Sequence, residues 1–168
     1  YDTIAPSQTL ALSGISPIGS AYLTGTTLYY RGVAAGSLSI ASTATDATSG
    51  VATIAFPALG GTTTGWTHTA ATVNAPGPYS SAYSWTAGAT SAPTATVTAT
   101  DAAANPASTT LTMANDSAVP TGGAILANGS ASATITNQTS PTLGVTNYAD
   151  AGSGIATQTL TRAYGATC

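Results

Sequence analysis

Residues 94–100 read TATVTAT, and this stretch decides the fold class because small apolar residues alternate strictly with threonine. Successive side chains of a β-strand point to opposite faces, so the alternation predicts a strand with one buried and one solvated face. Residues 37–45 show the same period, with Leu38 and Ile40 next to serines. Helix formers are scarce, and no segment repeats apolar residues at the 3.6 spacing of a helix.

Further strands are expected where β-branched and aromatic residues gather between turn signals. The predicted strands are residues 9–13, 26–31, 51–56, 83–86 and 109–113, and the turn signals are residues 16–19 (SPIG), 60–61 (GG) and 76–78 (PGP). Short strands with such punctuation predict an all-β sandwich rather than a parallel α/β sheet. We expect Trp66, Tyr83 and Trp85 to pack in its core rather than form a platform for carbohydrate.

The composition is unusual in its charge. Only 4% of residues are charged, against roughly 25% in ordinary soluble domains. There is no Lys and no Glu, and the two cationic side chains, Arg31 and Arg162, are isolated. Nucleic-acid binding needs clustered Lys and Arg, and a membrane helix needs about 20 apolar residues, so we expect neither partner for this chain. Edge strands without charged gatekeepers favour assembly with other copies or modules.

Internal repeats divide the chain into modules. Residues 44–53 (ATDATSGVAT) match residues 148–157 (YADAGSGIAT), which lie 104 residues downstream (150 − 46). Residues 2–6 (DTIAP) match residues 116–120 (DSAVP), which lie 114 residues downstream (116 − 2). The sequence therefore predicts one complete module over residues 1–119 and the opening strands of a second over residues 120–168. The difference between the two offsets predicts a shorter loop in the second module.

The end of the first module resembles that of bacterial immunoglobulin-like (Ig-like) repeat proteins. Residues 97–105 (VTATDAAAN) and 109–112 (TTLT), followed by residues 116–120, are similar to the closing strands, Thr-Asp-x-x-Gly-Asn turn and Asp-x-x-Ala-Pro linker of that family. The resemblance implies an Ig-like sandwich in a secreted or surface-exposed rod, with modules as spacers, adhesive units or filament subunits. Ala104 stands where the family has glycine, which argues against a metal at this turn.

No catalytic constellation is evident. Each Asp lies in a turn or linker motif, and paired carboxylates at catalytic spacing are missing from the pattern. His68 alternates with Trp66 on a Thr-rich strand, and there is no Gly-x-Ser-x-Gly elbow for a hydrolase. We interpret Asp46 and Asp150, each before Ala-x-Ser-Gly, as turn caps that bind backbone N–H groups. The chain is therefore predicted not to be an enzyme.

Two kinds of binding or modification site remain candidates. Calcium prefers hard oxygen ligands, and the resemblance implies that linker and turn acids of adjoining modules approach one another. The candidate ligands are Asp2, Asp46, Asp101, Asn105 and Asp116. Plain turn capping, with no cofactor, is the alternative.

Glycosylation is the other candidate, because three Asn-x-Ser/Thr sequons occur from the linker onward. They begin at Asn115, Asn128 and Asn137. Sugar would make a surface with so few charges more soluble, although the motif arises by chance in a chain rich in Ser and Thr.

These observations predict a non-enzymatic building block of a bacterial extracellular fibre, filament or adhesin stalk, located at the cell surface. Its partners would be copies of itself or adjoining Ig-like modules. The alternative is an adhesin module that binds carbohydrate or a receptor, with cell-surface glycans as partners.

In the second module, strands are expected at residues 124–126, 142–148 and 155–161. No counterpart of the closing strands follows, so further chain or a neighbouring subunit is expected to complete it. Cys168 is the single cysteine.

Overall fold

The computed structural model describes residues 1–129, 131 and 142–161 of the chain. These residues form strands and turns, and no helix occurs among them. The chain divides into unit 1, Tyr1–Ser117, and unit 2, Ala118–Cys168. Within the described residues no helix could cross a membrane.

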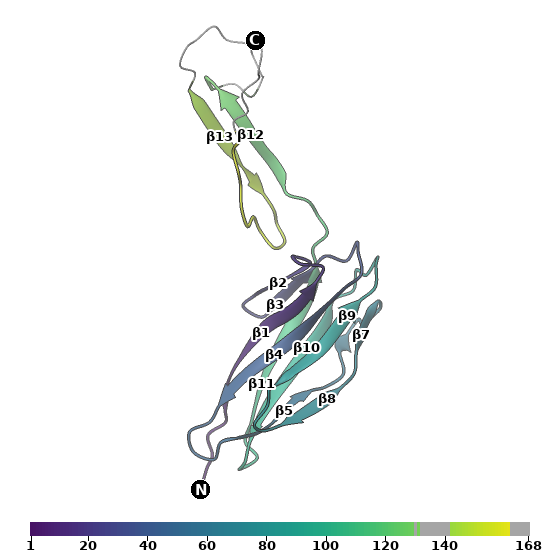
Figure 1. Cartoon of the computed structure of the whole chain (residues 1–168), viewed down its shortest axis with the longest axis vertical. Coiled ribbons are helices and arrows are strands. Elements are labelled where there is room, and N and C mark those ends of the chain that lie inside the picture. Colours follow the sequence, from purple (N-terminus) through teal and green to yellow (C-terminus); the bar gives the residue numbers. More distant parts are fainter. Residues whose placement is uncertain (130, 132–141, 162–168) are drawn as a thin grey trace. The chain divides into compact units, whose positions relative to one another are not determined.

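Unit 1 contains two β-sheets (Figure 1). The first sheet has the strand order β1-β4-β9-β7, and all its pairings are antiparallel. Its strands are β1 (Ser7–Ser16), β4 (Gly36–Thr45), β7 (Trp66–His68) and β9 (Ser80–Trp85). A register shift between Ser13 and Ser16 interrupts the β1–β4 ladder.

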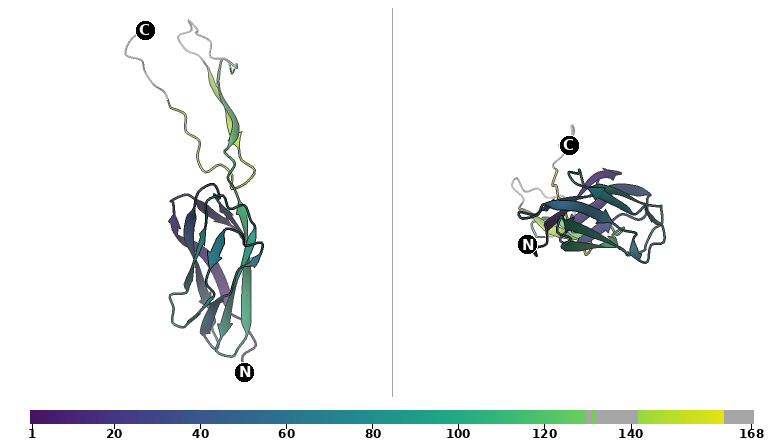
Figure 2. Two further views of the ribbon diagram at one scale, coloured as in Figure 1. Left: turned by 90° about the vertical axis from the view of Figure 1, so that its right-hand side faces the viewer. Right: turned by 90° about the horizontal axis from the view of Figure 1, so that it is seen from below.

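The second sheet has the order β2-β3-β11-β10-β5-β8, with β6 also paired to β10. Its strands are β2 (Ala21–Thr24), β3 (Thr27–Tyr30), β5 (Val51–Phe56), β6 (Gly60–Gly61), β8 (Ala71–Asn74), β10 (Pro93–Asp101) and β11 (Pro106–Asn115). The pairing of β3 with β11 is parallel. The strands run roughly along the length of the unit, with the N-terminus at one end (Figure 2).

The core of unit 1 lies between the two sheets. Along β10, the alternating residues that predicted a strand divide as expected: Ala95, Val97 and Ala99 are buried, and the intervening threonines are partly exposed. Leu38 and Ile40 of β4 face Leu28, Ile54, Phe56, Leu111 and Met113 of the other sheet within one hydrophobic cluster. This face-to-face burial of two strand layers is a sandwich-like, all-β arrangement, as the sequence predicted.

The rings of Tyr30, Trp66 and Trp85 pack against one another in this core, edge to face or tilted. Trp66 is 7% exposed and Trp85 3%, and both rings contact Tyr30, with centroids 4.8 and 5.5 Å away. Tyr83 is also buried, and burial raises the pKa of its phenol to about 12. The prediction that Trp66, Tyr83 and Trp85 belong to the core is confirmed, and these three do not form an exposed platform.

Unit 2 contains one antiparallel pair in its described part, β12 (Thr121–Ala127) and β13 (Leu143–Ala149).

Two predictions of secondary structure, one in each unit, were wrong. Gly60 and Gly61 were expected to form a turn, but they pair with Thr94 and Pro93 as the short strand β6. Residues 155–161 were expected to form a strand, but they are irregular. A strand requires a partner for its backbone donors and acceptors, and the described residues supply none to this segment.

Candidate metal site

Three carboxylates meet at one end of unit 1. One oxygen from each of Asp2, Asp46 and Asp101 lies within 4.8 Å of the corresponding oxygens of the other two. Asp46 follows β4, Asp101 ends β10, and Asp2 lies in the segment before β1. The antiparallel pairing of β5 with β10 brings Val51 opposite Asp101, which places the turn after Asp46 beside the turn after Asp101.

Asp101 is the most buried of the three, with only 2% of its surface exposed. Its Oδ1 accepts a hydrogen bond from the backbone N–H of Asn105 (2.7 Å), and its Oδ2 accepts one from the Asn105 side-chain amide (2.7 Å). Burial raises the pKa of this carboxyl, but the hydrogen bonds from Asn105, Ser49 and Ala103 together lower it below the ordinary value. Asp101 is therefore a buried group held in its charged form.

Asp46 caps the turn between β4 and β5. Its Oδ1 accepts hydrogen bonds from the backbone N–H groups of Thr48 (3.1 Å), Ser49 (2.8 Å) and Gly50 (2.9 Å). Gly50 has a φ of +77°, a conformation that residues with a Cβ rarely adopt, so glycine is needed to close this turn. The predicted turn cap at Asp46 is confirmed. All these hydrogen bonds are accepted by Oδ1, and none of them uses Oδ2.

Asp2 supplies the least satisfied oxygen of the cluster. Its Oδ1 accepts a hydrogen bond from the backbone N–H of Ile4 (3.0 Å). Its Oδ2 is buried and has no hydrogen-bond partner. A buried carboxylate oxygen without a donor, beside two other carboxylates, costs free energy unless a cation or a proton compensates it.

The arrangement fits a calcium ion. Ca²⁺ binds oxygens at about 2.3–2.6 Å, so two of its ligands lie at most about 5 Å apart, and the three carboxylates satisfy this limit. Backbone carbonyls and water would supply the remaining ligands of the six to eight that calcium takes. With such an ion bound, three negative charges would be offset at the point where the N-terminal segment meets both turns.

The other two candidate ligands have different positions. The side-chain amide nitrogen of Asn105 donates hydrogen bonds to Asp101 and to the backbone carbonyl of Asp2 (3.3 Å), so it helps to orient the cluster. Asp116 follows β11, a strand of ten residues that starts beside Asn105. At about 3.4 Å per residue this strand is about 34 Å long, so Asp116 lies at the opposite end of unit 1 from Asp2.

Ala104 does not prevent the Asp101 turn from closing. Ala104 adopts a φ of +69°, the left-handed conformation that glycine would take without strain. The backbone N–H of Asp101 still reaches the carbonyl of Asn105 (3.2 Å), and that of Ala104 reaches the carbonyl of Asp101 (3.2 Å). The replacement of glycine therefore strains the turn without removing the site.

The sequons lie at exposed positions where they are described. Asn115 is exposed, and its Oδ1 accepts hydrogen bonds from the Gly32 backbone (3.0 Å) and the Ser117 hydroxyl (2.7 Å). Asn128 is exposed, and its Oδ1 accepts one from the Thr142 backbone (3.0 Å). Asn137 lies outside the described residues.

His68, in β7, makes contacts with an aromatic ring and with backbone carbonyls. Its ring stacks on Tyr83 with centroids 3.9 Å apart. Its Nδ1 and Nε2 lie 2.9 Å from the carbonyl of Ala82 and 3.2 Å from that of Phe56. Ala82 belongs to β9, the neighbour of β7, and Phe56 ends β5 in the second sheet, so the His68 ring links the two sheets.

Comparison of the chain with protein-family models, with curated proteins and with solved structures finds no match. The Ig-like resemblance therefore stays a prediction. Sequence reasoning missed the positioning role of Asn105 and the orphaned oxygen of Asp2.

Proposed function

We propose that this chain is a non-enzymatic structural unit of a bacterial extracellular fibre, filament or adhesin stalk made of consecutive Ig-like modules. The observation that carries the proposal is the correspondence between β1–β4 and β12–β13. Each β12 residue lies 114 positions after a β1 residue, and each β13 residue lies 104 positions after a β4 residue, the offsets of the sequence repeats.

The register of the two strand pairs is the same. Ser7 pairs with Thr45, and Thr121 pairs with Ala149; at the other end, Ser13 pairs with Ser39, and Ala127 pairs with Leu143. A one-residue slip would invert both strand faces, so identical register at every shared position is a specific likeness. The shared register supports the view that the opening strands of one kind of module occur twice in this chain.

The turn after β13 also repeats the turn after β4. Asp150 Oδ1 accepts hydrogen bonds from the backbone N–H groups of Gly152 (2.9 Å) and Gly154 (3.1 Å). These correspond to the bonds that Asp46 accepts from Thr48 and Gly50. Gly154 takes a φ of +80°, as Gly50 takes +77°. The repeated cap supports the module boundary in the same way as the repeated register.

The path of the chain through unit 1 suits tandem modules. The chain enters beside Asp101 and Asn105, and β11 then carries it to the opposite end of the sandwich (Figure 1). A module that is entered at one end and left at the other extends a rod when it is repeated. Few charges on the surface reduce repulsion between neighbouring modules.

Calcium has a mechanical role in this proposal. An ion held by Asp2, Asp46 and Asp101 would cross-link the incoming segment to the β4–β5 and β10–β11 turns. Ions that bind only the folded state stabilise it by mass action, so the entrance of the module would become stiffer. The alternative function, binding of carbohydrate or a receptor, would have to use exposed tyrosines such as Tyr22 and Tyr148, because Trp66 and Trp85 are buried.

Electron microscopy of the native polypeptide tests the structural role. We expect rods with a regular repeat of about 4 nm, because strands of about 34 Å plus their turns set the module length. Isolated globular particles at all concentrations, together with turnover of any substrate that depends on His68, would contradict the proposal.

A further inference from the structure

Residues 155–160 of unit 2 correspond to β5, but no strand among the described residues pairs with them as β10 pairs with β5. The sequence GIATQTL at residues 154–160 matches GVATIAF at residues 50–56, again 104 positions apart. In unit 1 this segment is a strand in the middle of a sheet, between β8 and β10. In unit 2 the same segment is irregular, and Leu160 is 51% exposed where its counterpart Phe56 is fully buried.

The partner that β5 has in unit 1 is known in detail. Thr98 pairs with Ala55, Ala99 with Ile54, Thr100 with Thr53 and Asp101 with Val51. Ala95, Val97 and Ala99 of that partner point into the core and are at most 1% exposed. Unit 1 thus shows what kind of segment pairs with a β5-type strand. It is an extended chain in which threonine alternates with small apolar residues and which ends in Asp.

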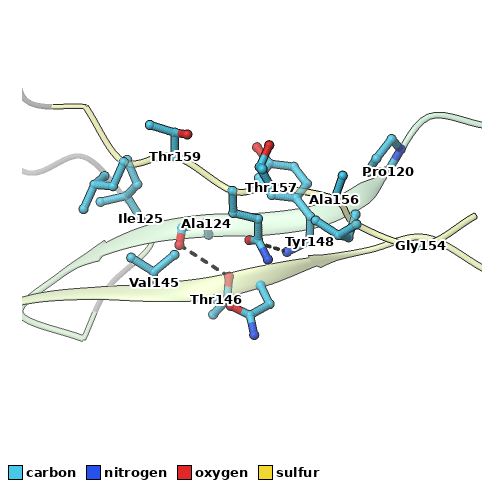
Figure 3. Close-up of a pocket in the computed structure, with 14 residues that line it drawn as sticks. Pro120, Ala124, Ile125, Val145, Thr146, Tyr148, Gly154, Ala156, Thr157 and Thr159 are labelled. Carbon is cyan, nitrogen blue, oxygen red and sulfur yellow. Dashed lines mark hydrogen bonds between the residues drawn. The ribbon is translucent and has the colours of Figure 1, made fainter. Parts of the chain in front are cut away.

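Unit 2 has an apolar space that the inward-facing side chains of such a strand would fill. A cavity of about 730 Å³ lies between the β12–β13 pair and residues 154–160, and Ala124, Ile125, Val145, Tyr148, Ile155 and Leu160 are among its lining residues. Figure 3 shows Ala124, Ile125 and Tyr148 with Thr157 and Thr159 of the irregular segment around this space. Ile125, Val145 and Tyr148 are each at least half exposed. Apolar side chains beside unpaired backbone favour strand addition.

We propose that unit 2 binds an extended strand of the β10 type, which pairs antiparallel with residues 155–160 and completes the second sandwich. The proposal rests on the proposed modular function and names its partner. By the register of unit 1, the bound strand would place the counterparts of Thr98, Thr100 and Asp101 opposite Thr159, Thr157 and Ile155. Its Asp would then arrive beside the Asp150 turn, as Asp101 does beside Asp46.

A folded second copy of this chain is not the donor. Its β10 is already paired with β11 on one edge and with β5 on the other. Release of β10 would open the core of unit 1, where Val97 and Ala99 are completely buried. The partner is therefore a β10-type strand that is not yet part of a finished sandwich.

Two positions of the matched segment are polar in unit 2 alone, Thr159 at the place of the half-buried Ala55 and Gln158. Gln158 stands at the position of Ile54, which is fully buried and opposite Ala99. In unit 2 its Oε1 accepts a hydrogen bond from the backbone N–H of Tyr148 (3.1 Å). Replacement of Gln158 by Ile would remove a polar group from the proposed interface, so it should strengthen strand binding.

Hydrogen exchange of the full chain, with a synthetic peptide of residues 93–101 (PTATVTATD), tests the inference. We expect exchange at residues 155–160 to slow by about tenfold or more as the new ladder forms, with no change at residues 51–56. A scrambled peptide is the control. Thr157→Pro should abolish the protection because proline cannot donate to the ladder, and Gln158→Ile should increase it.

Unchanged exchange at saturating peptide would overturn the inference, and so would equal protection by the scrambled peptide. Slowed or accelerated exchange at residues 51–56 would show invasion of unit 1 and would also overturn it. The outcome is separate from that for the modular function: rods in the microscope without peptide binding would remove the strand site alone. Peptide binding without rods would remove the fibre proposal.

Discussion

The β1–β4 and β12–β13 pairs share their register but differ in what covers them. In unit 1, Leu38 and Ile40 are buried by the opposite sheet. In unit 2, the positions that correspond to Leu38 and Ile40 are Thr142 and Gly144, which bring no large apolar side chain to that face. Leu143 and Val145 lie on the other face, at the positions of Ser39 and Ala41, and both are more than half exposed. The difference shows that a strand pairing can be repeated without the apolar residues that a buried face needs. A pair of strands alone is marginally stable in water.

The strongest test of this comparison is Ile40→Ala, with Gly144→Ala as its counterpart in unit 2. Ile40 is fully buried, so its truncation should cost unit 1 about 2–5 kcal/mol of unfolding free energy. A Cβ on Gly144 would make ordinary contacts with Leu126, at 3.5 Å, so that change should alter stability by less than about 0.5 kcal/mol. Both tryptophans lie in unit 1, so urea titration followed by their fluorescence reports this unit, and hydrogen exchange of the β12 and β13 amides reports unit 2. Equal effects of the two variants would contradict the comparison.

Calcium should stabilise unit 1 through Asp46 but not through Asp150. At a concentration 100 times the dissociation constant, a bound ion adds about 2.7 kcal/mol. Asp46→Asn should remove this gain while keeping the turn cap, because an amide oxygen also accepts the backbone N–H groups. Asp150→Asn is the matched control and should leave the gain intact. The measurement is the melting temperature of unit 1 with calcium and with chelator. A wild-type chain that melts identically in both would remove the calcium proposal.

Acid should weaken unit 1 through Asp101, which has no counterpart among the described residues of unit 2. The pKa of Asp101 is lowered in the folded state, so its ionisation contributes stability that is present above the unfolded pKa of about 3.9. That stability is lost as the pH falls below about 4 and through the folded pKa. Urea midpoints between pH 2 and 7 should therefore decrease on the acid side, and Asp101→Asn should flatten this decrease. A steeper decrease in the variant would show that another carboxyl is responsible.

The smallest expected effect concerns the β10–β11 turn. Ala104→Gly should stabilise unit 1 by about 0.5–1 kcal/mol, because relief of the left-handed strain exceeds the added entropy of glycine in the unfolded chain. Ala103→Gly, at the neighbouring position without a positive φ, should be neutral or slightly destabilising. Thermal melts of the two variants would give opposite signs. A destabilised Ala104→Gly variant would show that the strain is compensated elsewhere.

Much of the fold could be predicted from the sequence because alternation is a local property. Strand β5 lies at the predicted residues 51–56, and β10 includes the whole predicted stretch 94–100. Strands β2 and β8 were not predicted, since a strand of only four residues is too short to show a clear alternation. Of the five candidate calcium ligands, Asp2, Asp46 and Asp101 meet. Asn105 contacts this cluster through its amide nitrogen, and Asp116 lies at the other end of β11.

The sequence by itself determined the alternating strands, the Asp-capped turns and the register shared by the two strand pairs. These features depend on residues within one strand pair or one turn, so the repeated motifs carry them from one module to the next. Tertiary structure alone decided that Asp2, Asp46 and Asp101 approach one another, because they are brought together by pairing between segments far apart in the chain. It also decided that residues 51–56 form a strand and residues 155–160 do not. Backbone hydrogen bonds of a strand are completed by its neighbour, and only unit 1 supplies that neighbour in the described residues.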